Sequence, residues 1–234
     1  MLEIPVTDVV ALLWFAGIWV GYTIYTDRGK PRTHSLRAAM HKNRYRWMQQ
    51  VLKRENRLLD ANVLGQLAHG ASFFASTSAV ILVGLFTILG AKRDVTAFVS
   101  NLPFVEKTTP LQWELRLLVL IIIFTHAFFK FTWGLRQFNY CAVLVGAAPA
   151  AKGSIDEEWT KRTAWISTLA SKDFNQGLRA YYFSLATVGW FVNAWMFMAA
   201  TALTVWVLYY REYHSEALRS LRFPGELDTD KIKP

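Results

Sequence analysis

One apolar run constrains this chain more than any other feature of its sequence. Residues 115–135 carry only two charged side chains, Arg116 and Lys130, and also hold His126. A helix of about 20 residues covers roughly 30 Å of bilayer hydrocarbon, so this run is long enough to span a membrane. Hydrocarbon offers an ammonium group no hydrogen bond, so Lys130 must reach a partner, water or a headgroup. Position 130 is therefore predicted to be either an interfacial anchor or part of a polar site.

Three further apolar runs are candidate spans. They cover residues 9–25, 68–89 and 182–210. Gly189 and Asn193 could break the last run, but no proline or polar turn lies inside it, so we expect one span. Hydrophobic residues make up 53% of the chain, above the roughly 45–50% that is usual for soluble domains. These runs predict an all-α integral membrane four-helix bundle, a single domain over 1–215 and a weakly ordered tail over 216–234.

Basic residues predict the orientation in the membrane. The chain has a formal net charge of +9, and ten lysines and arginines fall within residues 27–64. The loop between the second and third spans holds three. Because short cytoplasmic loops carry the excess of basic residues, the N-terminus is predicted to lie outside and residues 27–64 in the cytoplasm.

The first cytoplasmic segment is predicted to form one basic amphipathic helix over residues 35–64. Neither glycine nor proline occurs in it, and apolar residues recur at helical spacing. Such a helix can lie on an anionic lipid surface or pack against its own protein, and both interpretations remain open. The first interpretation makes seven basic residues lipid contacts: Arg37, Lys42, Arg44, Arg46, Lys53, Arg54 and Arg57.

A polar stripe follows the third span. Residues three or four apart share one helix face, and the stripe comprises His126, Lys130, Trp133, Gln137 and Cys141. It could line a polar crevice or a water-filled path. In the alternative, Lys130 reaches back to the interface and Trp133 belongs to the interfacial aromatic belt.

Small residues predict close helix contacts. Gly17 and Gly21 form a G-x-x-x-G pattern in the first span, and Ser72 and Ser76 are spaced likewise in the second. Small side chains let helix backbones approach each other in lipid. Packing within the bundle is the favoured interpretation, with contacts between identical copies as the alternative. Asn193 is expected to make one interhelical hydrogen bond.

Several function classes find no support. The chain lacks the short motifs of zinc proteases, serine hydrolases and nucleotide-binding loops. One cysteine allows neither an internal disulfide nor a cysteine-based metal cluster. No nucleic-acid-binding pattern accompanies the basic residues. We therefore expect no catalytic residue, metal or cofactor; the best constellation for an enzyme acting on lipid would be Asp60 with Lys130 or His69.

Several motifs resemble one known family. They are the runs at residues 11–17, 44–48, 57–61, 72–77, 128–133, 135–141, 146–149 and 175–183. Together they are similar to the bacterial integral membrane proteins grouped as domain of unknown function 599, over about residues 10–212. The resemblance implies a proteobacterial inner-membrane protein of four spans and implies no activity.

The leading functional hypothesis is a non-enzymatic homo-oligomer that forms a channel-like or solute-conducting assembly. A structural membrane organiser or lipid-binding scaffold is the alternative, and a membrane enzyme acting on lipid ranks below both. The expected partners are membrane lipids, preferentially anionic, and further copies of the chain.

Overall fold

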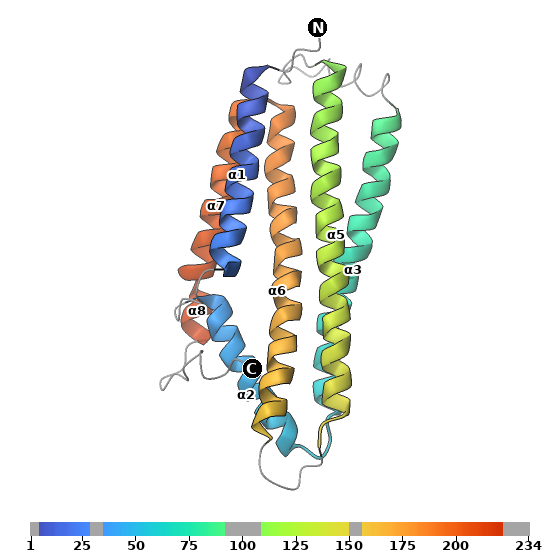
Figure 1. Cartoon of the computed structure of the whole chain (residues 1–234), viewed down its shortest axis with the longest axis vertical. Helices are drawn as coiled ribbons and strands as arrows, with labels where there is room; N and C mark the ends of the chain where they lie inside the picture. The colour runs from blue at the N-terminus through green and yellow to red at the C-terminus, as the bar shows by residue number, and fades with distance from the viewer. Residues whose placement is uncertain (1–4, 29–34, 92–108, 150–155, 222–234) are drawn as a thin grey trace. The chain divides into compact units, whose positions relative to one another are not determined.

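The computed structural model describes residues 5–28, 35–91, 109–149 and 156–221 (Figure 1). The helices are α1 (Val6–Arg28), α2 (Leu36–Lys53), α3 (Leu58–Gly90), α5 (Pro110–Gly146), α6 (Glu157–Val188), the 3-10 turn η1 (Gly189–Phe191), α7 (Ala194–Tyr213) and α8 (Glu216–Leu221). No strand occurs among these residues, so the all-α prediction is confirmed.

Three helices are long and apolar enough to cross a membrane: Val6–Asp27, Leu58–Gly90 and Pro110–Gly146. They contain three of the four predicted spans. The chain is thus a membrane protein by the length and composition of these helices. A bundle of four spans is not confirmed.

The prediction of one helix over residues 182–210 is wrong. α6 ends at Val188, η1 follows, and α7 begins at Ala194. The Oδ1 of Asn193 accepts a hydrogen bond from the backbone N–H of Met196 at 2.7 Å. Asn193 therefore caps the start of α7, where the first N–H groups have no partner within the helix. The interhelical hydrogen bond expected of Asn193 is replaced by this local cap.

The prediction of one helix over residues 35–64 is also wrong. α2 ends at Lys53, and Arg54 adopts an extended backbone conformation with φ −91° and ψ 133°. The Oδ1 of Asn56 then accepts a hydrogen bond from the backbone N–H of Leu58 at 2.9 Å, where α3 begins. The end of the segment predicted to be cytoplasmic and the second predicted span consequently both lie in α3, which runs unbroken from Leu58 to Gly90.

The chain divides into two compact units. Unit 1 comprises Met1–Arg28, Ala75–Phe129 and Gln176–Leu208; unit 2 comprises Gly29–Phe74, Lys130–Asn175 and Tyr209–Pro234. The boundary between the units falls inside α3, α5 and α6, so each of these helices has one part in unit 1 and another part in unit 2. Each unit has its own core.

Aromatic rings fill the core of unit 1. Phe15 of α1 lies 5.0 Å from Phe197 of α7 and 5.7 Å from Phe183 of α6, measured between ring centroids. Trp19 stacks on Phe183 at 5.4 Å. Edge and offset contacts of this kind add to the free energy of burial. They hold α1, α6 and α7 side by side within this unit (Figure 1).

Unit 2 is held together by α2, α5 and α6. Its apolar core includes Tyr45 and Met48 of α2, Cys141 of α5 and Ala164 of α6. α5 and α6 approach each other closely at Gly134, where an added Cβ would lie 3.1 Å from the carbonyl oxygen of Ala170.

The glycines of α1 make no close helix contact like the one at Gly134. Gly17 and Gly21 are exposed, and nothing among the described residues lies within 4 Å of a Cβ placed on either. The prediction that Gly17 and Gly21 pack against another helix of the bundle is therefore wrong for the described part of the chain. In α3, Ser72 is half-buried and Ser76 exposed, whereas Ser78 is buried and its Oγ lies 3.0 Å from the Tyr181 hydroxyl.

The predicted weakly ordered tail begins with a helix. α8 (Glu216–Leu221) packs on α2, and the Asn43 side chain donates to the carbonyl oxygen of Leu221 at 3.4 Å. Leu218 is buried there. The tail prediction is wrong for these six residues, and residues 222–234 lie outside the described part of the chain.

Candidate functional site

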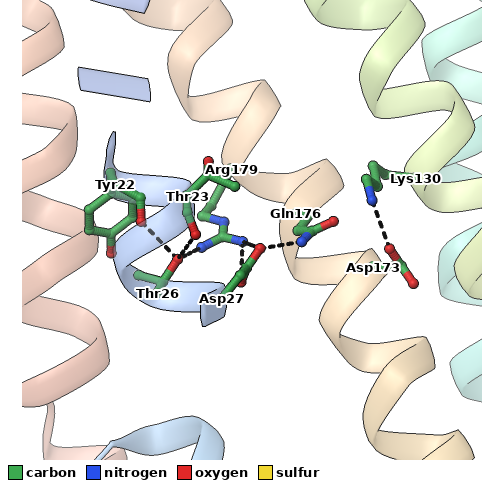
Figure 2. Close-up of polar contacts among 8 residues, drawn as sticks. All are labelled: Tyr22, Thr23, Thr26, Asp27, Lys130, Asp173, Gln176 and Arg179. Carbon is green, nitrogen blue, oxygen red and sulfur yellow. Dashed lines mark hydrogen bonds and ion pairs between the residues drawn. The ribbon is translucent and has the colours of Figure 1, made fainter. Parts of the chain in front are cut away.

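Lys130 and Gln137 converge on one carboxylate. The Lys130 ammonium donates to Oδ1 of Asp173 at 3.0 Å, and the Gln137 amide donates to Oδ2 of the same residue at 2.7 Å. Lys130 and Gln137 belong to α5, whereas Asp173 belongs to α6 within unit 2. Figure 2 shows the lysine and the aspartate pointing toward one another.

Helical spacing and a glycine build this site. Lys130 and Gln137 are seven residues apart, about two turns, and therefore share a face of α5. Gly134 lies between them, and a Cβ there would be 3.8 Å from the Cβ of Asp173. The missing side chain lets α6 come close enough for a short aspartate to reach both partners.

The site is partly desolvated. The Lys130 side chain is 31% exposed and that of Asp173 is 12% exposed, while Gln137 is buried. The Oε1 of Gln137 is buried and accepts no hydrogen bond within the described chain. A cation, a carboxylate and a carboxamide thus meet at one point, and the carboxamide oxygen is an available acceptor.

The rest of the predicted stripe does not join this site. Trp133 is 51% exposed, whereas Cys141 is buried and its thiol lies 3.9 Å from the carbonyl oxygen of Thr163. His126 belongs to unit 1, where its exposed ring lies edge-on to Trp19 at 5.7 Å. The sequence analysis did not identify Asp173 as a site residue. An acid on the apolar face of an amphipathic helix was the signal that could have identified it.

A second polar network lies in unit 1, between α1 and α6. The Arg179 guanidinium contacts both carboxylate oxygens of Asp27, at 3.0 and 3.1 Å, and donates to the Thr26 hydroxyl. Gln176 donates to Asp27 as well. Figure 2 shows these side chains gathered at the end of α1. Both contacts to Asp27 come from one guanidinium nitrogen, Nη2, while Nη1 donates to Thr26. This charge-assisted contact fixes the end of α1 against α6, which is a structural role.

A third network in unit 1 is the most deeply buried. Asp8 of α1 accepts from the Gln112 amide at 3.1 Å and from the Trp190 indole at 2.9 Å. The Arg116 guanidinium lies 3.6 Å from Asp8 and 5.6 Å from the centre of the Trp190 ring. The side chains of Asp8 and Arg116 are 5% and 1% exposed. Sequence reasoning missed this cluster, although Arg116 stands out as a charge within one apolar run and Asp8 directly precedes another.

Two of the arginines predicted to contact lipid instead bind groups of unit 2 itself. Arg54 forms an ion pair with Asp60 at 2.6 Å. Arg57 donates to three backbone carbonyl oxygens, those of Val51, Ala148 and Pro149. Asp60 is almost fully buried and also accepts from the Trp47 indole at 2.7 Å. Asp60 therefore pairs with Arg54, where the enzyme hypothesis required Lys130 or His69.

The other predicted lipid contacts differ in exposure. Lys42 is buried, Arg44 and Arg46 are half-buried, and Lys53 is exposed. The backbone N–H of Arg37 donates to the Glu212 carboxylate at 3.2 Å. The layer is thus not a uniform charged surface. In the described part of the chain, no group of three histidine, cysteine or acidic residues could hold a metal ion.

Long apolar helices with ion pairs between them define the class: an all-α membrane protein with charged residues paired on its helices. The chain belongs to the family described as protein of unknown function, DUF599, whose model matches residues 10–217. Comparisons with curated proteins and with solved structures found no match.

Proposed function

We propose that the chain is a non-enzymatic, solute-conducting protein of the bacterial inner membrane that acts as a homo-oligomer. The site that would serve conduction is formed by Lys130, Gln137 and Asp173. The observation that carries the proposal is the ion pair between Lys130 of α5 and Asp173 of α6. α5 is one of the helices that are apolar and long enough to span a membrane.

Charged groups on such helices are costly, and they commonly mark solute or proton pathways. The Lys130–Asp173 pair is neutral as a whole, so it does not provide the cationic lining that would favour anions. A pair with one third of its lysine exposed and an unused carboxamide oxygen suits a solute that both donates and accepts hydrogen bonds. A small zwitterionic or neutral polar solute fits this chemistry best.

The exposed glycines of α1 support association between copies. Gly17 and Gly21 offer a flat surface with open space above it on a candidate membrane span. Glycines four apart commonly mediate contacts between spanning helices.

Flux through reconstituted vesicles tests the proposal. Wild type, Lys130→Met and Asp173→Asn would be compared with glycine, potassium and chloride as probes. Arg162→Gln is a matched control, because Arg162 pairs with Glu158 on the exposed surface of α6. Glycine flux in the wild type that is lost in both site variants and kept in the control supports the proposal. Variants that change thermal stability but leave all fluxes at wild-type values would contradict it.

A lipid-binding scaffold is the second candidate. Its support is the concentration of basic residues on α2, of which Lys53 is exposed and Arg44 is half-buried. Retention of phosphatidylglycerol through purification, reduced by reversing these charges to glutamate, would favour this candidate. Vesicles without any probe flux would favour it further.

A further inference from the structure

Arg136 is the only exposed charge on α5, all of which the structure describes. The other charged side chains of this helix are Glu114, Arg116 and Lys130. Arg116 is buried, and Glu114 and Lys130 are half-buried. Because α5 is apolar and long enough to span a membrane, an exposed guanidinium on it has to reach water or a lipid headgroup.

Two aromatic side chains with polar edges share the face of Arg136. Trp133 lies three residues before the arginine and Tyr140 four residues after it, so all three stand on one side of α5. Trp133 is 51% exposed and Tyr140 is 44% exposed, and all three residues belong to unit 2. Tryptophan and tyrosine are enriched where spanning helices meet the headgroups. This face therefore has the composition of a helix surface at the level of the headgroups.

Tyr140 holds the Arg136 side chain in place. The guanidinium Nε donates to the Tyr140 hydroxyl oxygen at 2.7 Å, and the guanidinium carbon lies 5.9 Å from the centre of the tyrosine ring. This contact leaves the two terminal guanidinium nitrogens as donors. Since the tyrosine oxygen is the acceptor of the bond, its own O–H remains a donor as well. One contact thus orders an outward-facing set of donors.

These donors have no acceptor within the described part of the chain. Arg54 of the same unit pairs with Asp60, and Arg57 donates to backbone carbonyl oxygens. Arg136 makes neither kind of contact, and the Trp133 indole N–H has no acceptor among the described residues either. At the edge of a bilayer the available acceptors are water and lipid phosphates. Of the two, a phosphate offers a negative charge and paired oxygens that match the guanidinium fork.

We infer that Trp133, Arg136 and Tyr140 form a binding site for the phosphodiester of an anionic membrane lipid. The terminal nitrogens of Arg136 bind two phosphate oxygens, while the Tyr140 hydroxyl and the Trp133 indole N–H donate from either side. No carboxylate of the described chain neutralises Arg136, which favours a headgroup without a cation of its own. The bound lipid fixes the depth of α5 in the membrane. The site does not depend on conduction at Lys130, and it gives the scaffold candidate a lipid site on α5.

Thermal unfolding of the delipidated full-length protein in detergent tests the inference. Phosphatidylglycerol, phosphatidylcholine and inorganic phosphate would be added separately. Phosphatidylglycerol should raise the unfolding midpoint most, because the choline group of phosphatidylcholine competes for the phosphate. Inorganic phosphate at the same concentration should leave the midpoint unchanged, since it has no acyl chains to lie along the helix.

Variants of the exposed face locate the lipid. Arg136→Gln should raise the phosphatidylglycerol concentration that gives half of the shift by about tenfold or more, since it removes the charged donors. Tyr140→Phe keeps the ring but removes one donor and the contact that orders the guanidinium, so it should raise that concentration about threefold to tenfold.

The matched control is Arg162→Gln, which removes an equal charge from an exposed side chain of the same unit. It should respond like the wild type. If Arg136→Gln fails to fold, Tyr140→Phe decides the question. Equal shifts with both lipids, a shift with inorganic phosphate, an equal loss in Arg162→Gln, or wild-type responses in both site variants would each overturn the inference.

Discussion

Trp190 donates its indole N–H to Asp8 at 2.9 Å, which gives the break between α6 and α7 a structural role. Trp190 lies in the 3-10 turn η1 and is fully buried, and its ring stacks on Phe197 at 4.8 Å. A continuous helix would hold position 190 in a different orientation from the one in this turn. The break thus supplies one of the donors that satisfy a buried carboxylate beside Arg116.

Asp8→Ala should strongly destabilise the protein. The change leaves the Arg116 guanidinium buried without its carboxylate, and breaking a buried ion pair from one side costs about 3–5 kcal/mol. Trp190→Phe keeps an aromatic ring against Phe197 but removes the indole donor, so it should cost less, about 1–3 kcal/mol. Unfolding in detergent measures both. Equal effects of the two variants would show that the indole donor, rather than the charge of Arg116, dominates this cluster.

Gly134→Ala and Gly84→Ala should have opposite effects. At position 134 the new methyl group would lie 3.1 Å from the Ala170 carbonyl oxygen and would push α6 away, at a cost of about 1–3 kcal/mol. At position 84 nothing described lies within 4 Å, so the better helix propensity of alanine should stabilise by about 0.5–1 kcal/mol. Thermal unfolding midpoints of the wild type and the two variants measure these opposite effects. A stabilising Gly134→Ala would contradict the close approach of α5 and α6.

Lys130 and Asp173 should be energetically coupled. Lys130→Met, Asp173→Asn and the double variant form a thermodynamic cycle, and contacting partners show interaction free energies of about 0.5–3 kcal/mol. Each single change leaves one partner uncompensated, so the double variant should lose less stability than the sum of the two. Strict additivity would show that Lys130 is an interfacial anchor with no dependence on Asp173.

Arg57→Lys should loosen the connection between α2 and the end of α5. Arg57 donates to the carbonyl oxygens of Val51 at 3.2 Å and Ala148 at 2.8 Å, which needs the planar fork of a guanidinium. Faster amide hydrogen exchange at Ala147 and Ala148 is the expected result. Arg162→Lys is the control, because its exposed pair with Glu158 contributes little. Unchanged exchange in Arg57→Lys would show that these contacts do not restrain the chain.

The break at residues 189–193 changes the expected topology. If α6 and α7 cross separately, the number of crossings changes parity and the C-terminus lies opposite the N-terminus. Single cysteines at Thr7 and Ser215, in a Cys141→Ser background, would be treated with an impermeant thiol reagent in spheroplasts. Thr7 should react and Ser215 should not. Reaction at both positions would instead support the four crossings predicted from the sequence.

Local signals in the sequence predicted much of the fold. The apolar runs correctly predicted helices at residues 9–25, 68–89 and 115–135, because hydropathy over about 20 residues depends on the run itself. The two breaks were missed although both have local causes. Asn56 and Asn193 each begin a helix by accepting a backbone N–H, and single caps of this kind compete with a strong helical pattern on either side.

The sequence by itself determined that this chain is helical, membrane-embedded by composition and basic on α2, because each property follows from residues close together in the chain. Helical spacing also placed Lys130 and Gln137 on one face. Only the tertiary structure decided their partner, since Asp173 lies 43 residues from Lys130 and on another helix. It likewise brought Asp8 to Trp190 across 182 residues. The choice among acids and donors depends on which helix faces meet, and that depends on packing details such as the missing side chain at Gly134.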